Sequence, residues 1–288
     1  MAKLRNQPLT STEIARYLNA QDDFALEMQV YSLALSYGYE ASHGGTYEDP
    51  VTKKPRQYDI RANSIREDRR IDLAIECKSL KSSYPIVVSR IPRMASEAYH
   101  QVVCSLKRER GPFYTHDFTP SETLRIENKV GSPIYPEKGL VGKSTVQIGI
   151  SDKGDFVSGD SDVYDKWSQA LSSLSELASA ACWYRDNSES GFYLTALFPV
   201  LVVPDGTLWV ADYDMSGKLL TEPHAVEETT IFMGREYWSA GSGSYNVSHL
   251  HVCTLAGIDS FMHFLLASDD AWERLFPMTE VLDRLAEA

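Results

Sequence analysis

The sequence predicts a mixed α/β fold, in which helices flank a mixed central β-sheet within a single elaborated domain over residues 1–288. Two segments, 22–37 and 164–181, repeat apolar residues at the 3.6-residue spacing of amphipathic helices. Runs rich in Val, Ile, Tyr and Phe, bounded by turn residues, indicate strands. A chain of 288 residues with 43% hydrophobic content can bury a sizeable core. The order of helix, three strands, insertion, helix and strand favours helices covering one sheet.

Residues 22–37 are expected to form the first helix. Asp22 and Asp23 are N-cap candidates, and Gly38 is a C-terminal stop signal. The apolar stripe comprises Phe24, Met28, Tyr31 and Leu35. Glu27 falls on or beside this stripe rather than opposite it, so its carboxylate needs a partner or a purpose inside the fold.

A strand at 39–47 and a basic loop at 50–56 are expected to precede a β-hairpin within residues 56–78. With Glu67–Asp68 at the tip, the numbers of opposed residues add up to 135. This register gives one continuous apolar face. Its opposed pairs are Tyr58 with Cys77, Ile60 with Ile75, and Ala62 with Leu73.

The other face of the same hairpin is charged. Asp59 is directly opposite Glu76, and Gln57 is opposite Lys78. Opposed side chains have Cβ atoms about 4.5–5.5 Å apart, and like charges there destabilise a sheet. Two alternatives follow: a solvated sheet face on which Lys78 neutralises one acid, or a site that uses both carboxylates.

Beyond the hairpin, the pattern divides the chain into a core, an insertion and a C-terminal extension. The core comprises 22–78 and 164–215, the insertion 79–163, and the extension 216–288. Further elements are expected at 86–89 (strand), 94–108 (helix), 193–203 (strand), 247–255 (strand), 259–267 (helix) and 278–286 (helix).

Positive charge is concentrated around the hairpin. Residues 53–110 contain 14 Lys+Arg and 7 Asp+Glu, a charge of +7 within a chain of −12, which leaves −19 for the remainder. The basic stretch is either a solvated surface or a contact for a polyanion.

The cysteine spacing and the hydropathy predict a cytoplasmic protein with no membrane span. The four cysteines are far apart and have no metal-ligand spacing; they are Cys77, Cys104, Cys182 and Cys253. Reduced, buried thiols are expected. The N-terminus lacks an apolar export signal, and no run reaches about 18 apolar residues.

Glu27 would bring a third carboxylate to Asp59 and Glu76 if its helix packed on the hairpin. Carboxylate oxygens are the hard ligands that Mg²⁺ and Mn²⁺ prefer, and an ion would remove the repulsion between the acids. Lys78, two residues after Glu76, points to the same face and can reach a water or phosphate there. Such a site can polarise a phosphodiester and orient a hydroxide.

These residues resemble the PD-(D/E)XK nuclease superfamily, which has the restriction-endonuclease-like fold. Asp59 followed by Glu76-Cys77-Lys78 matches the D…E-x-K signature, and the helix with Glu27 resembles the first core helix of several branches. The resemblance is close over 22–78, and looser through the later helix and strand of an αβββαβ core. Tyr58 stands in place of the signature proline, and no Q-x-x-x-Y motif follows.

The resemblance implies a metal-dependent endonuclease that uses Mg²⁺, with Mn²⁺ as a substitute. Asp59 and Glu76 would be metal ligands, Glu27 an accessory ligand, and the Cys77 carbonyl a further ligand. Lys78 would position or activate the attacking water. The implied substrate is DNA rather than RNA, and family analogy suggests genome defence against phage.

Several other residues are candidates for binding. Phosphate contacts are expected from basic side chains near the acids, with a solvated surface as the alternative: Arg61, Arg66, Arg69, Arg70, Lys81, Arg90 and Arg93. Asp72, on the face of Glu76, is either a secondary ligand or the partner of an arginine. His249 and His251 alternate onto one face without a third ligand, which favours a structural role. Residues 239–246 are Gly-rich but lack a P-loop ending, so a flexible loop is expected there.

A non-catalytic nucleic-acid-binding or interaction module with the same fold is the alternative function. It predicts metal-independent, salt-sensitive binding through the basic stretch. A third reading is an α/β protein with an acidic sheet face and no nucleic-acid role. The acidity outside residues 53–110 predicts modest affinity for duplex DNA, so a homo-oligomer or a partner protein is expected to assist.

Overall fold

The computed structural model describes residues 6–21, 23–106, 122–128, 134–159, 161–181, 191–239, 243–276, 278–279 and 282–283. The helical elements are α1 (Ser11–Gln21), α2 (Phe24–Ser36), the 3₁₀ turn η1 (Ala95–Glu97), α3 (Ser161–Ala181), α4 (Leu255–Leu266) and α5 (Asp269–Leu275). The strands are β1 (Glu40–His43), β2 (Thr46–Glu48), β3 (Pro55–Gln57), β4 (Ile60–Arg66), β5 (Arg69–Cys77), β6 (Ile86–Pro92), β7 (His100–Leu106), β8 (Glu122–Asn128), β9 (Leu140–Ile150), β10 (Phe156–Gly159), β11 (Phe192–Val203), β12 (Leu208–Asp212), β13 (His224–Ala225), β14 (Glu228–Ser239) and β15 (Gly243–Thr254).

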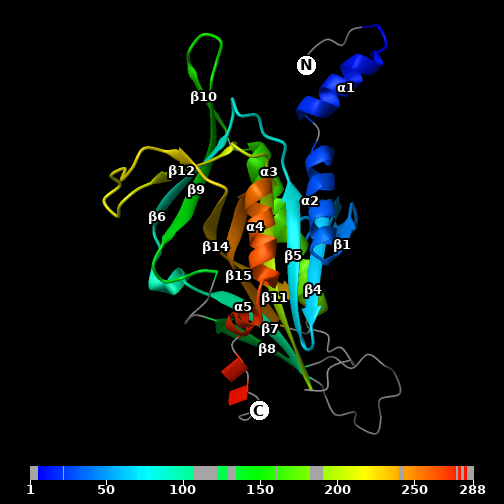
Figure 1. The fold of residues 1–288 in the computed structure, drawn as a ribbon, viewed down its shortest axis with the longest axis vertical. Coiled ribbons are helices and arrows are strands. Elements are labelled where there is room, and N and C mark those ends of the chain that lie inside the picture. The colour runs from blue at the N-terminus through cyan, green and yellow to red at the C-terminus, as the bar shows by residue number, and fades with distance from the viewer. Residues whose placement is uncertain are drawn as a thin grey trace.

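The protein is mixed α/β, as predicted, with helices on both faces of a large sheet (Figure 1). The sheet has 13 strands, and its main order is β1-β4-β5-β11-β15-β14-β9-β6-β12-β13. Strand β11 runs parallel to both β5 and β15, whereas β4 and β5 are antiparallel. Strands β2 and β3 form a separate pair.

The hairpin of β4 and β5 has the predicted register. Ile60 pairs with Ile75 and Ala62 with Leu73, so the numbers of opposed residues add up to 135. The two-residue turn places Glu67 at φ 53°, in the left-handed region. This register holds because a shift of one residue would turn every apolar side chain of β5 to the opposite face.

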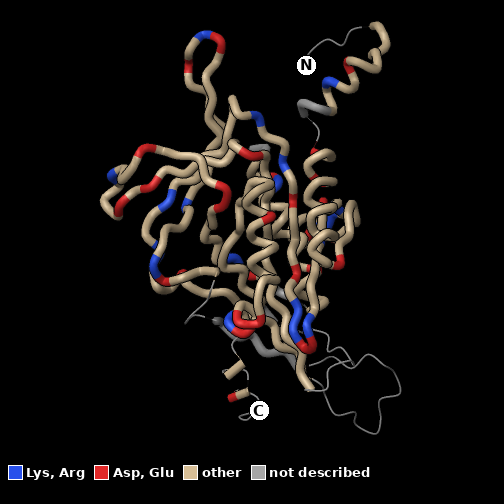
Figure 2. Tube along the Cα trace, viewed as in Figure 1, with Lys and Arg blue, Asp and Glu red and all other residues tan. Residues whose placement is uncertain are grey.

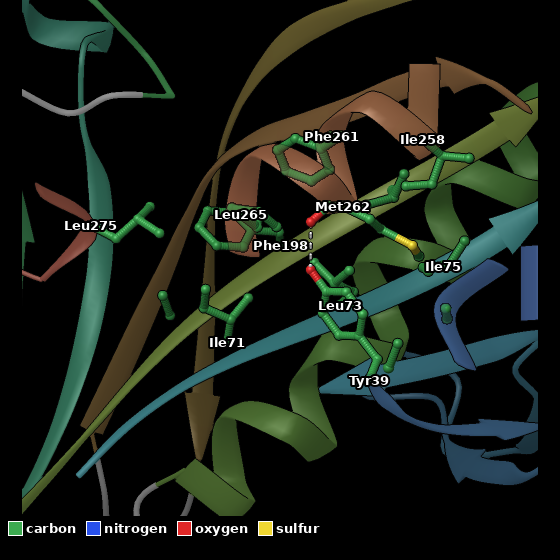
Figure 3. Packing of buried hydrophobic residues seen from close by; sticks show 14 of the residues in the cluster. Tyr39, Ile71, Leu73, Ile75, Phe198, Ile258, Phe261, Met262, Leu265 and Leu275 are labelled. Atoms are coloured by element: carbon green, nitrogen blue, oxygen red, sulfur yellow. Dashed lines mark hydrogen bonds between the residues drawn. The ribbon is translucent and has the colours of Figure 1, made fainter. Parts of the chain in front are cut away.

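Alternate residues of β5 face two different hydrophobic clusters. Ile71, Leu73 and Ile75 pack in the cluster that also contains apolar residues of α2 and α4. Figure 3 shows this packing, including the hydrogen bond of 3.2 Å that the Tyr39 hydroxyl donates to the Met262 carbonyl. Ala74 instead packs in a cluster with leucines of α3. Because side chains alternate along a strand, Asp72 and Glu76 also lie on the α3 side.

The predicted strand at 39–47 is divided into β1 and β2. Gly44 adopts φ 72°, and a Cβ at Gly45 would lie 2.1 Å from the Tyr58 hydroxyl oxygen. The Tyr58 amide donates to the Gly45 carbonyl at 2.9 Å. The close approach of Tyr58 therefore requires a glycine, and the chain turns there.

The predicted helix at 94–108 is wrong. Residues 94–106 form η1 and then β7, which pairs with both β11 and β8, and 107–108 lie outside the described residues. Val102, Val103 and Cys104 are fully buried in this strand. Tertiary pairing and β-branched residues outweigh the helical spacing. Residues 79–163, predicted as an insertion, thus contribute strands to the main sheet, among them β6, whose predicted start at 86 is confirmed.

The three later helix predictions have different outcomes. Helix α3 is close to the predicted 164–181, and α4 covers most of 259–267. Of the helix predicted at 278–286, only residues 278–279 and 282–283 lie within the described part of the chain, and these are helical. In the portion of the chain that the structure describes, no helix has the length and apolar character needed to cross a membrane.

Candidate functional site

Asp59 and Glu76 meet at one end of the β4–β5 hairpin. Asp59 immediately precedes β4, and Glu76 is the second-last residue of β5. Asp59 is 9% exposed and Glu76 is fully buried. The Asp59 Oδ2 atom accepts a hydrogen bond from the Cys77 amide at 2.8 Å, which fixes its carboxylate beside the end of β5.

Lys166 of α3 lies among these acids. Its Nζ donates a hydrogen bond of 2.8 Å to Asp59 Oδ2. The same Nζ is 3.7 Å from Glu76 Oε2 and 3.8 Å from Asp23 Oδ2. A single ammonium therefore bridges carboxylates from three parts of the chain: the residue before α2, the residue before β4, and β5.

Asp23 connects the end of β5 to the start of α2. Its Oδ1 accepts from the Ser79 amide at 2.6 Å. Its Oδ2 lies 3.5 Å from the Lys78 Nζ. Lys78, predicted to act at Glu76, thus has its closest charged contact with Asp23, the expected N-cap residue of α2.

Glu27 reaches the edge of this cluster from α2, which covers the opposite, apolar face of the hairpin. Its Oε2 lies 2.8 Å from His43 Nε2, on β1. Burial raises the pKa of Glu27, while its hydrogen bond to His43 lowers it and the charge of Asp59 raises it; the net pKa is raised. Glu27 thus interacts with Asp59 through charge, and its direct partner is the histidine.

Glu76 is the acid of the cluster whose charge is least compensated by its surroundings. Both of its carboxylate oxygens are buried without a hydrogen-bond partner in the described part of the chain. Burial raises the pKa of Glu76 well above its usual range; Asp59 raises it further, and Lys166 offsets part of the effect. For Lys166, burial lowers the pKa, but the attraction of Asp59, Glu76 and Asp23 is stronger and the net pKa is raised.

The residues fit a divalent ion in chemistry but do not surround one in this arrangement. Within the described residues, no three His, Cys, Asp or Glu side chains converge as a metal-binding group. However, a buried carboxylate without partners is costly unless a cation or a proton neutralises it. Asp59 and Glu76 supply the hard oxygens that Mg²⁺ and Mn²⁺ prefer. Cys77 is buried, which raises the pKa of its thiol well above the usual range and leaves only its backbone carbonyl as a ligand candidate.

Six of the seven basic residues predicted to contact phosphate bind other parts of the chain. Arg90 forms two hydrogen bonds to Asp212, and Arg93 donates to the Pro136 carbonyl and Thr230. The remaining contacts are Arg61 with Glu176 and the Ser173 carbonyl, Arg66 with Asp269 and the Leu266 carbonyl, Arg69 with Glu273, and Arg70 with Asp72. Lys81 is exposed. Their role toward phosphate stays a prediction.

Asp72 has the arginine partner that one of its two predicted roles requires. It lies opposite Asn63, as expected, and accepts from Arg70 Nε at 2.8 Å. Its carboxylate and the Arg70 guanidinium are both largely buried. This pair lies four residues before Glu76 along β5, on the same side of the sheet.

His249 and His251 are buried in β15, in agreement with a structural role. His251 contacts Glu228 Oε1 at 3.1 Å and the Tyr135 hydroxyl at 2.7 Å. His249 stacks on the Tyr135 ring at 3.8 Å. The Gly-rich residues 239–246 were expected to be a loop, but 239 and 243–246 pair within the β14–β15 hairpin, and 240–242 lie outside the described residues.

Lys166, Asp23 and His43 were missed as site residues. A signal for Lys166 exists in the sequence: Val163 and Ala170, at i−3 and i+4, are both buried, so the lysine lies on the buried face of its helix. Asp23 was noted only as a cap, and nothing in the local pattern marks His43, because its partner is sixteen residues away.

Comparisons with protein-family models, with curated proteins and with solved structures found no match. The geometry of the chain itself therefore carries the functional argument. A groove of about 670 Å³ is also present between α2 and α4, but it is lined by residues such as Met28, Leu33 and Asp259 rather than by the site carboxylates.

Proposed function

We propose that the protein is a metal-dependent nuclease that hydrolyses phosphodiester bonds in DNA. The observation that carries the proposal is the pair Asp59 and Glu76, at one end of the β4–β5 hairpin. These two acids share one ammonium, and both oxygens of the buried Glu76 lack a hydrogen bond of ordinary geometry among the described residues. A buried acid without hydrogen-bond donors is costly to the fold, and such acids cluster at sites that bind a ligand.

The arrangement of the elements supports the resemblance to PD-(D/E)XK nucleases. Helix α2 precedes β1, β4 and β5, and α3 precedes β11. The four strands are neighbours in the order β1-β4-β5-β11, with β11 parallel to β5. This order is compatible with an αβββαβ core. The two acids lie at the end of the hairpin, and α3 supplies Lys166 from the same side of the sheet.

The residues divide the chemistry among them. Asp59 and Glu76 would hold Mg²⁺ or Mn²⁺, with the Cys77 carbonyl as a further ligand and Glu27, held by His43, as an accessory acid. When bound, the ion supplies charge neutralisation at the phosphate and a more acidic water. Lys78, which Asp23 holds at 3.5 Å, is the candidate to position that water. Lys166 holds positive charge at Asp59 and Glu76.

Binding of the nucleic acid is proposed to need assistance. The net charge is −12, and most arginines of the basic stretch are engaged within the chain. Non-specific affinity for DNA depends on the number of phosphates that free cations neutralise. We therefore expect modest affinity, aided by self-association or by a partner protein. Defence against foreign DNA in the cytoplasm is the biological role that the resemblance suggests.

The test is cleavage of supercoiled plasmid, linear duplex, single-stranded DNA and RNA with Mg²⁺, Mn²⁺ or EDTA. The wild type should give metal-dependent products, and Glu76→Gln should give none. Glu176→Gln is the matched control, because this glutamate is exposed on α3 and pairs with Arg61. Full activity of folded Glu76→Gln would refute the assignment.

A non-catalytic nucleic-acid-binding module is the second candidate. It is favoured by one observation: the position between the acids is filled by Lys166, and the described residues contain no ready three-ligand group. This function predicts salt-sensitive binding that EDTA does not change. Metal-dependent cleavage at stoichiometric protein, absent in Glu76→Gln, rules it out.

A further inference from the structure

We propose that the Lys166 ammonium acts as a built-in counter-ion in the position of the divalent metal, and that metal binds to Asp59 and Glu76 only after this side chain moves away. The inference rests on the proposed function and adds to it a control on metal loading. Lys166 thereby sets the metal concentration at which the site becomes active.

The contacts of Lys166 are those of a small cation in an acidic cluster. Its Nζ lies 2.8 Å from Asp59 Oδ2, 3.7 Å from Glu76 Oε2 and 3.8 Å from Asp23 Oδ2. The side chain is 19% exposed, so most of it is enclosed by the protein. Lys78 is the lysine of the signature motif. Among the described residues, the only one of these three acids that it contacts is Asp23, at 3.5 Å.

The ammonium and a divalent ion compete for the same oxygens. Asp59 Oδ2 already accepts hydrogen bonds from the Cys77 amide and from Lys166. An ion on this oxygen would take the place of the lysine proton. A divalent charge and an ammonium a few ångströms apart also repel strongly inside a protein. The lysine therefore has to leave the carboxylates when the ion arrives.

The alternative is that Lys166 is an ordinary structural ion pair that remains in place. The two roles predict opposite effects on metal binding. A counter-ion that competes with the metal weakens binding, so its removal strengthens it. A structural lysine orders the two carboxylates, so its removal weakens metal binding or leaves it unchanged.

The first experiment measures Mn²⁺ affinity by isothermal titration calorimetry for the wild type, Lys166→Met and Lys153→Met. Methionine keeps most of the length of the unbranched side chain and removes the charge. Lys153 is exposed in the turn between β9 and β10, so its substitution controls for the loss of one positive charge. We expect Lys166→Met to bind Mn²⁺ at least about tenfold more tightly than both other proteins, the order of magnitude for losing one nearby charge at partial burial. Unchanged or weaker binding overturns the inference.

The outcomes separate this inference from the proposed function. If wild type and Lys166→Met bind Mn²⁺ equally, and the wild type cleaves DNA, the counter-ion role fails and the nuclease stands. If Lys166→Met binds Mn²⁺ more tightly than the wild type, and the wild type cleaves no substrate under any condition, the counter-ion role stands and the nuclease fails. If Lys166→Met and the wild type both fail to bind Mn²⁺, both are refuted. The double variant Lys166→Met/Glu76→Gln must lose the added affinity if the ion binds at these acids.

The second experiment uses the unaltered protein, in case Lys166→Met does not fold. The rate of acylation of Lys166 by an amine-reactive reagent is measured by mass spectrometry, with and without Mn²⁺. Exposed Lys81 in the same sample is the internal reference. We expect Mn²⁺ to increase the relative labelling of Lys166 severalfold, because the released ammonium becomes accessible. An unchanged or decreased rate overturns the inference.

Discussion

Both ends of the β4–β5 hairpin carry charged residues, but the charges have different partners at the two ends. At the tip, Arg66 and Arg69 are directly opposed, like charges that should destabilise a sheet. At the other end, Asp59 precedes β4 where Glu76 nears the end of β5. Figure 2 shows basic and acidic residues gathered at the tip, where the hairpin meets α5.

At the tip, each arginine has an acid brought by another element. Arg66 binds Asp269 at 3.0 Å and lies over the Trp272 ring at 4.6 Å, and Arg69 binds Glu273 at 2.8 Å. These partners come from α5, about 200 residues later in the chain. The repulsion across the tip is thus partly offset by the two acids of α5, and these charges are paired within the fold.

At the other end, the acids outnumber their cations. Two lysines, Lys166 and Lys78, lie beside three acids, Asp23, Asp59 and Glu76. The Glu76 oxygens have no hydrogen bond of ordinary geometry among the described residues. Each tip arginine lies within about 3 Å of an acid, whereas the nearest cation to Glu76, the Lys166 ammonium, is 3.7 Å from its Oε2 atom. The difference distinguishes a tip whose charges are paired within the fold from an acidic end with charge to spare, which is the end at which we propose that a cation binds.

The largest expected effect is on catalysis at the acidic end. Asp59→Asn keeps an oxygen to accept from the Cys77 amide but loses a metal ligand. Because a bound ion supplies several kcal/mol of transition-state stabilisation, we expect cleavage to fall by at least about 10³-fold. The rate of metal-dependent DNA cleavage is measured at saturating protein.

Asp165→Asn is the matched control for this loss. Asp165 is exposed and adjacent to Lys166 in sequence, so its substitution changes one charge near the site without removing a ligand. It should cleave at close to the wild-type rate. Similar cleavage rates for Asp59→Asn and Asp165→Asn would show that Asp59 has no catalytic role, and the acidic end of the hairpin would then differ from the tip in charge pairing alone.

The next effect is on stability, nearer to the tip. Asp72→Asn removes the charged partner of Arg70, whose guanidinium is only 14% exposed. Breaking one side of a buried ion pair typically costs about 3 kcal/mol or more. We expect the free energy of unfolding to fall by about that amount in urea denaturation. A loss below about 0.5 kcal/mol, the range of exposed pairs, would show that this pair does not hold the hairpin.

Glu76→Gln should instead stabilise the metal-free protein at neutral pH. Because burial raises the pKa of Glu76 in the folded state, the folded protein retains this proton at pH values where the unfolded chain has lost it. The contribution of Glu76 to the free energy of unfolding is therefore fully present below a pH of about 4.3, the ordinary pKa of glutamate. It is lost as the pH rises through the pKa of Glu76 in the folded protein. Removing the charge should raise the free energy of unfolding by about 1 kcal/mol at pH 8.

The pH dependence is the measurement that checks this sign. Thermal unfolding of wild type and Glu76→Gln in EDTA should differ at pH 8 and converge as the pH approaches 4.5. Glu27, whose pKa is also raised by burial, contributes in the same direction in both proteins. A Glu76→Gln variant less stable than the wild type at pH 8 would mean that the ion pair with Lys166 outweighs the cost of burial.

The smallest expected effect is at the turn. Glu67 has a φ of 53°, a left-handed conformation that costs a non-glycine residue about 1–2 kcal/mol. Glu67→Gly relieves this cost but adds entropy to the unfolded chain, so a net gain of about 0.5 kcal/mol is expected. Cleavage should not change. A destabilised Glu67→Gly would show that the Glu67 side chain, rather than the turn geometry, stabilises the tip.

The hairpin could be predicted in detail, whereas β7 could not. The register of Ile60 with Ile75 follows from alternation alone, since only one register puts every apolar side chain on the same face. In 94–108, by contrast, apolar residues fit both periods, and the choice of a strand comes from pairing with β11, whose partner residues lie about 90 positions away. Such pairing leaves no local signal.

The sequence by itself determined the helices α2 and α3, the hairpin register and the opposition of Asp59 and Glu76, because these depend on periodicities of 3.6 and 2 within short segments. Only the tertiary structure decided that α2 covers the apolar face while α3 covers the acidic one. That choice places Lys166 between the acids, leaves Glu27 with His43, and assigns the tip arginines to α5. The physical reason is that periodicity encodes which side of an element is apolar, but contacts between distant segments determine what covers it.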